Sequence, residues 1–163
     1  MNLKLYIASS IALLIAAGAC SDKSRNSTQS ENPEKIARDG GDLIYSGVLP
    51  AADTPGIATI LLLDFDDHSD IEGDYTYTEK SLGNDGFTAT SEGDFHIITT
   101  KTDSTDLRYI RLTPDEDDNT VDGKKTPGIV RYFLIDNDST LTMTDSTLMR
   151  PASGLPYNLQ LKK

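Results

Sequence analysis

Short apolar runs separated by turn residues are the feature that most constrains the fold of this chain. From Asp42 onward the runs are rich in Val, Ile, Leu, Tyr, Phe and Thr, and clusters of Gly, Asp, Asn and Pro divide them. No segment has the periodicity of an amphipathic helix. The chain is therefore predicted to be all-β, with strands at 43–49, 57–65, 73–80, 86–91, 94–101, 106–113, 128–136, 140–145 and 156–162.

The connections between these runs are short, which favours an up-and-down order of antiparallel strands. Turn residues lie at 66–70, 83–86 and 136–139. About eight such strands predict one small antiparallel domain, either a barrel or a sandwich. The one long polar interruption, Pro114–Pro127, is expected to be a flexible loop. Most aromatic side chains should be core, and the sequence leaves open whether a barrel interior would be filled or would hold one small ligand.

Residues 1–19 have the pattern of a secretory signal peptide, with Lys4 ahead of the apolar run Ile7–Ala17. That run is shorter than the roughly 20 residues needed to span a bilayer. Its end, Ala17-Gly18-Ala19-Cys20, resembles the lipobox of bacterial lipoproteins. We expect cleavage before Cys20 and acylation of that cysteine by chains such as palmitate, and the alternative is an ordinary secreted protein cleaved nearby.

Cys20 is the only cysteine in the chain, so it can form no disulfide within it. Several acyl chains would give the stable anchoring that a single chain does not. Ser21, in place of the Asp that retains lipoproteins at the inner membrane of enteric-type bacteria, favours the outer membrane, with the domain facing the periplasm or the surface. Residues 20–41 are predicted to be the lipidated cysteine and a flexible polar tether.

The charge balance argues against nucleic-acid partners. Loss of residues 1–19 removes one of the 15 basic residues and none of the 26 acidic ones, so the formal net charge changes from −11 to −12. Such a surface repels nucleic acids and anionic lipid headgroups.

One stretch carries a specific motif: Tyr45, Gly47-Val48-Leu49-Pro50, Ala52-Asp53 and Pro55-Gly56-Ile57. It resembles Y-x-G-V-L-P-C-A-D-C-x-G-I, the signature of the NlpE lipoproteins, often called copper resistance or copper homeostasis lipoproteins. The similarity extends over about residues 43–163. It implies a lipocalin-like barrel over 42–163 in an outer-membrane lipoprotein, tied to copper and to envelope stress sensing at surfaces. Some members have a second, OB-like domain, and this chain is expected to be a single-domain member.

The two cysteines of that motif are Ala51 and Thr54 here. A Cys-x-x-Cys pair can form a disulfide, exchange thiols or bind Cu(I), and alanine and threonine do none of these. The soft or imidazole ligands that remain have no metal-ligand spacing: His68, His96, Met143 and Met149. No metal or cofactor site is predicted. The family-motif loop is interpreted as a structural corner, with a reactive site as the alternative: Gly47, Val48, Leu49, Pro50, Ala51, Ala52, Asp53, Thr54, Pro55 and Gly56.

Two acidic segments are further candidates. Asp64–Glu72 could suit a hard cation such as Ca²⁺, but a solvated hairpin turn is favoured because the EF-hand spacing is missing. Asp115–Asp118 is predicted to be a disordered loop tip, or else an interaction surface.

No catalytic motif is present, so no enzymatic activity is expected. The sequence favours a sensor or interaction module with a protein partner in envelope signalling. The alternative functions are a carrier of a small hydrophobic ligand and, less favoured, direct metal binding.

Overall fold

The computed structural model describes residues 42–83, 86–102 and 105–163, and in these residues the regular structure is all β. The strands are β1 (Leu43–Leu49), β2 (Ile57–Phe65), β3 (Glu72–Ser81), β4 (Thr88–Lys101), β5 (Asp106–Val121), β6 (Lys124–Lys125), β7 (Arg131–Asn137), β8 (Thr140–Thr144) and β9 (Asn158–Leu161). The predicted signal peptide, Cys20 and the tether to residue 41 lie outside the described residues. None of the described residues forms a helix with the length and apolar character needed to cross a bilayer.

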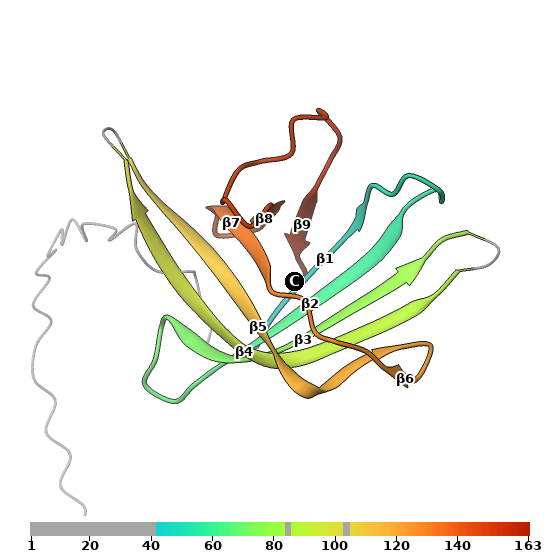
Figure 1. Ribbon diagram of the computed structural model, residues 1–163. Helices are drawn as coiled ribbons and strands as arrows, with labels where there is room; N and C mark the ends of the chain where they lie inside the picture. Colours follow the sequence, from blue (N-terminus) through green and yellow to red (C-terminus); the bar gives the residue numbers. More distant parts are fainter. Residues whose placement is uncertain (1–41, 84–85, 103–104) are drawn as a thin grey trace, which may run out of the picture. The chain divides into compact units, whose positions relative to one another are not determined.

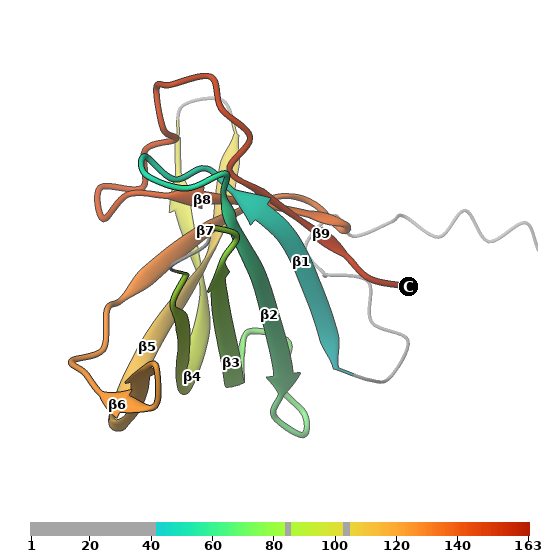
Figure 2. The same cartoon turned by 90° about the vertical axis from the view of Figure 1, so that its right-hand side faces the viewer.

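The strands form a closed antiparallel barrel in chain order (Figure 1). Each of β1 to β4 pairs with the strand that follows it in the chain. Strand β5 then pairs with β7, β7 with β8, and β8 with β9. Closure comes from β9, which pairs with β1 through Tyr45↔Leu161 and Ser46↔Gln160 (Figure 2). The short β6 pairs only with the end of β5, so the barrel itself has eight strands in the described part of the chain. The expected up-and-down barrel is confirmed.

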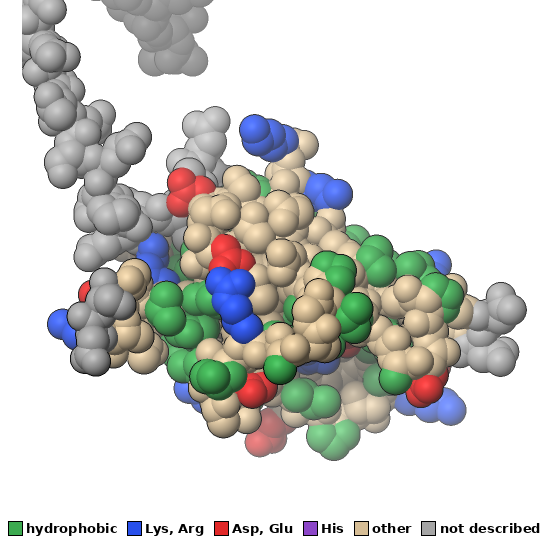
Figure 3. Space-filling model, turned by 90° about the horizontal axis from the view of Figure 1, so that it is seen from above, with side chains coloured by type: hydrophobic (Ala, Val, Ile, Leu, Met, Phe, Trp, Pro, Cys, Tyr) green, Lys and Arg blue, Asp and Glu red, His purple; other side chains and the backbone are tan. Residues whose placement is uncertain are grey.

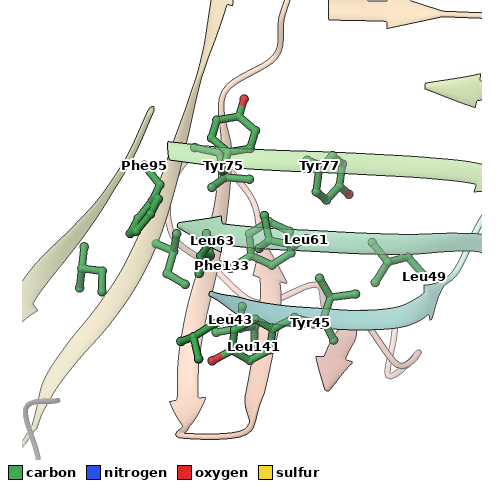
Figure 4. Close-up of a cluster of buried hydrophobic side chains, with 14 residues drawn as sticks. Leu43, Tyr45, Leu49, Leu61, Leu63, Tyr75, Tyr77, Phe95, Phe133 and Leu141 are labelled. Carbon is green, nitrogen blue, oxygen red and sulfur yellow. The ribbon is translucent and has the colours of Figure 1, made fainter. Parts of the chain in front are cut away.

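The barrel centre is packed with side chains. Alternate residues of each strand point inward, as the pleat requires, and the fully buried aromatics are Tyr45, Tyr77, Phe95 and Phe133 (Figure 4). Leucines from five strands add to this core: Leu43, Leu49, Leu61, Leu63, Leu112, Leu141 and Leu159. Burying each such side chain contributes about 1.5–3 kcal/mol. The centre of the barrel is therefore filled by its own residues.

The expected strands 86–91 and 94–101 are one strand, β4, which bends at Gly93. Gly93 has φ +151°, and a Cβ there would lie 2.3 Å from the Thr113 carbonyl oxygen. Glycine permits this close approach of β4 to β5. The glycine therefore marks a bend within a strand, and the prediction of a strand boundary there was wrong.

The predicted flexible loop Pro114–Pro127 was also wrong, because β5 runs on to Val121 and turns into β6. Between the pairs Gly93↔Pro114 and Ser91↔Asn119, four residues of β5 oppose the single residue Glu92. The acidic run 115–118 is thus an exposed bulge in a strand, not a disordered tip. The buried side chain of Asn119 fixes the far end of this bulge, since its Oδ1 accepts a hydrogen bond from Ser91 Oγ at 2.6 Å.

Candidate functional site

The family-motif loop joins β1 to β2 in a corner tied to its neighbours by hydrogen bonds. Thr54 Oγ1 accepts from the Gly56 N–H at 3.3 Å, and its hydroxyl donates to the Gly56 carbonyl oxygen at 3.1 Å. The same carbonyl accepts the Leu82 N–H at 3.0 Å, which links the corner to the chain after β3. Gly56 has φ +150°, and a Cβ there would lie 2.6 Å from Val48 Cγ1. Backbone contacts and glycine thus hold this corner without any thiol.

The two positions where the family motif has cysteine lie at the surface of this corner. Ala51 and Thr54 are half-buried, and the residues between them, Ala52 and Asp53, are exposed. Thr54 packs against Gly83, where a Cβ would lie 3.3 Å from Thr54 Cγ2. The side chains at these positions offer methyl groups and one hydroxyl, so the loop has contact surface but no redox chemistry.

A cavity lies at the same end of the barrel as this corner. In an up-and-down barrel β3 and β5 end where β4 and β7 begin, and these four strand ends surround the cavity together with the segment 126–130. Its volume is about 260 Å³. Most of its lining is apolar, including Phe87, Ala89, Val121, Pro127 and Ile129. We call it the mouth cavity.

A charged pair, largely buried, closes the polar side of the mouth cavity. Arg131 Nη2 lies 3.1 Å from Glu79 Oε2, and the two side chains are 18% and 15% exposed. Tyr77 donates its hydroxyl proton to Glu79 Oε1 at 2.9 Å, and the Arg131 guanidinium lies 4.5 Å from the Tyr77 ring centroid. Burial, and then the Glu79 carboxylate, raise the pKa of Tyr77, so its hydroxyl stays a neutral donor.

These three residues were not identified as a site from the sequence. Tyr77 was expected only as core, and Arg131 only as part of a strand. Glu79 and Arg131 are 52 positions apart, and barrel closure alone brings them together. No local spacing could have revealed the pair.

A second polar group, which includes Ser91 and Asn119 of the cavity lining, is hydrogen-bonded within the protein. Ser91 uses its proton on Asn119 Oδ1, so in the 2.9 Å contact between the Tyr75 and Ser91 hydroxyls Tyr75 is the donor. Asn119 Nδ2 donates to the Asp115 carbonyl oxygen. The backbone carbonyl oxygen of Asn119 accepts a further hydrogen bond from the Thr126 N–H at 2.9 Å. The network fixes both β5 and the start of the 126–130 segment.

The acidic segment Asp64–Glu72 spans the β2–β3 connection at the opposite end of the barrel, with its first two residues in β2 and its last in β3. Its backbone turns through a Ser69 N–H to Asp66 carbonyl bond of 3.0 Å. Nearby carboxylates, Asp42 foremost, raise the pKa of Asp64. The segment has the geometry of a hairpin turn with crowded negative charge.

The soft and imidazole side chains do not come together. His68 is in that turn with φ +72°, and His96 Nε2 lies 3.4 Å from Glu72 Oε2. Met143 packs on the core, and Met149 is exposed. Among the residues that the structure describes, no three His, Cys, Asp or Glu side chains are grouped to hold a metal ion.

Comparison with known proteins gives one match. Residues 45–154, about two thirds of the chain, match the family described as the NlpE N-terminal domain. No curated protein and no solved structure matches the chain.

Proposed function

Because the chain belongs to the NlpE N-terminal domain family, which is associated with the cell envelope and generally non-enzymatic, we propose that it is a non-enzymatic envelope lipoprotein. In this proposal it acts as a sensor or interaction module in envelope stress or surface contact. The resemblance of residues 17–20 to a lipobox supports acylation of Cys20. Ser21 after it supports the outer membrane, with a polar tether that would let the domain reach a partner.

The observation that carries this proposal is the thiol-free corner at residues 50–56. Its backbone is fixed, and two apolar side chains flank it: Val48, 50% exposed, and Leu82, 47% exposed. Both approach Gly56, where a Cβ would lie 2.6 Å from Val48 and 3.9 Å from Leu82. Exposed apolar side chains on a fixed corner suit a protein contact better than metal or redox chemistry. Figure 3 shows hydrophobic side chains gathered in patches between polar ones on one face.

The experiment is deletion of the gene, with an envelope-stress reporter read during surface contact. We expect the response to fall on deletion and to return with the wild-type precursor. Complementation with Cys20→Ser, which blocks acylation, should fail to restore the response. An unchanged response in the deletion strain would count heavily against the proposal.

A second function, carriage of a small hydrophobic ligand, is favoured by the mouth cavity. The packed centre of the barrel leaves no room for a ligand there, but the mouth has an apolar hollow with a few polar groups, the usual composition of a ligand site. Native mass spectrometry of protein purified from its host should then show a bound small molecule, and spectra of the apo mass alone would contradict carriage.

A further inference from the structure

The mouth cavity has mainly apolar walls and one charged side, formed by Glu79 and Arg131. We propose that it binds an uncharged, mainly apolar small molecule with one carbonyl-type acceptor, such as an ester, which Arg131 holds. This inference rests on the carrier role and adds the place and the chemistry of the ligand.

On the charged side of the cavity, Arg131 has N–H donors beyond those that its protein partners accept. Glu79 already accepts on both oxygens, from Tyr77 at Oε1 and from Arg131 at Oε2. Arg131 has five N–H donors, and its hydrogen bonds within the described residues go to Glu79 and to the Ile129 carbonyl oxygen. The remaining donors need an acceptor when the cavity is occupied, because a buried donor without a partner is destabilising. A ligand carbonyl meets that need.

The charges of the site select against an anionic acceptor. The Glu79 carboxylate neutralises Arg131, so a carboxylate or phosphate would gain attraction from one and repulsion from the other. The chain as a whole is acidic, with a formal net charge of −11. Desolvating a charged ligand costs much more free energy than desolvating an uncharged one. An ester is therefore expected to bind more tightly than its parent acid.

Hydrogen bonds hold one wall of the site. Segment 126–130 forms one wall, held by the Thr126 N–H to Asn119 bond and by Arg131 Nη1, which donates to Ile129 at 3.2 Å. Tyr77 both lines the cavity and belongs to the core cluster. The cavity volume of about 260 Å³ is below the roughly 300–1,000 Å³ of sites that bind drug-sized molecules. The expected ligand is therefore smaller than a drug-sized molecule. A wall held in place lowers the ordering cost of binding.

The test is amide chemical-shift titration of the mature chain, carrying Cys20→Ser to prevent acylation. Methyl hexanoate and hexanoate at neutral pH are the probes. We expect shifts at the ends of β3, β4 and β5 and along 126–131, with a Kd for the ester about tenfold below that for the acid. Equal or tighter binding of hexanoate, or no binding of the ester, would overturn the proposed chemistry.

Two variants locate the site. Ala89 points into the cavity and Ala58 to the outside of the barrel, because Ala89 shares the inward parity of Ser91 and Ala58 alternates with the buried Thr59. Ala89→Phe should weaken ester binding about tenfold, whereas the control Ala58→Phe should leave it unchanged. Ile129 lies on the cavity wall and is 64% exposed, so its substitution is not expected to impair folding. Ile129→Asn should also weaken binding.

The failure of this inference and of carriage can be told apart. If the ester binds with unchanged affinity to Ala89→Phe and Ile129→Asn, the mouth cavity is not its site, although carriage stands if host-purified protein holds a molecule. If host-purified protein is empty and the ester does not bind, both are wrong.

Discussion

Replacing Tyr45 with phenylalanine should stabilise the protein. Tyr45 is fully buried in β1, within the core cluster of Figure 4. Among the residues that the structure describes, no protein group hydrogen-bonds to its hydroxyl. A buried hydroxyl without a partner costs about 1–3 kcal/mol in mutational data. Part of that gain is lost with the contacts of the oxygen atom itself. We therefore expect Tyr45→Phe to raise the free energy of unfolding by about 1 kcal/mol and Tm by about 4 °C.

Alkaline pH should widen this difference. Burial, and then Asp138, raise the pKa of Tyr45 from its ordinary value of 10.0 to about 12. Between those values the unfolded chain loses the Tyr45 proton while the folded chain keeps it, so the wild type loses stability as pH rises. Phenylalanine has no such proton, and its advantage should grow by up to roughly 1.4 kcal/mol per pH unit above 10.

The assay is urea unfolding followed by near-ultraviolet circular dichroism at pH 7 and at pH 10.5. Tyr77→Phe is the matched control, because the Tyr77 hydroxyl donates to Glu79 at 2.9 Å. Its loss should destabilise the fold by about 1–3 kcal/mol. If Tyr45→Phe destabilised the protein as much as Tyr77→Phe does, the Tyr45 hydroxyl would have a favourable role that this reasoning lacks.

Four further outcomes are expected. Arg131→Met should cost about 3 kcal/mol in urea unfolding because Glu79 is left buried and unpaired; a double variant with Glu79→Leu that is no more stable than the single one would contradict this. Gly93→Ala should cost about 2 kcal/mol in the same assay, and more than the control Gly123→Ala, where a Cβ meets nothing within 4 Å and only the positive φ of +72° opposes the substitution. Asp145→Asn should lower Tm at pH 7 but not near pH 2, because the Met149 N–H and the Thr147 hydroxyl lower the pKa of Asp145 in the folded protein. The resulting stabilisation is present above the unfolded pKa of 3.8 and is lost as pH falls through the folded pKa. An equal loss of Tm at both pH values would refute this. Calorimetry with Cu²⁺, Cu⁺ and Ca²⁺ should give no heat of binding, and saturable heat would reinstate direct metal binding.

The parts of the fold that depend on local pattern could be predicted from the sequence. β1 and β2 have the predicted bounds, because alternation and clear turn residues define both. The up-and-down order followed from short connections. These features are set by neighbours in the chain, which a sequence displays directly.

The parts that failed depend on contacts far along the chain. Pro114 and the acidic residues after it have the composition of a loop, but the hydrogen bond from Ser91 to Asn119 keeps that stretch within β5. The Glu79–Arg131 pair at the mouth cavity likewise exists only after closure. Both errors come from tertiary interactions that override local preference.

Capture of a partner by the lipidated protein in intact envelopes tests the central claim most directly. Leu82→Asn alters the apolar flank of the 50–56 corner, and Ile71→Asn is its control, since Ile71 is 54% exposed in the β2–β3 turn at the other end of the barrel. After crosslinking, wild type and Ile71→Asn should each enrich the same protein of envelope signalling, and Leu82→Asn should enrich it less. Equal enrichment by all three, or none by the wild type, would contradict a sensor that works through this corner.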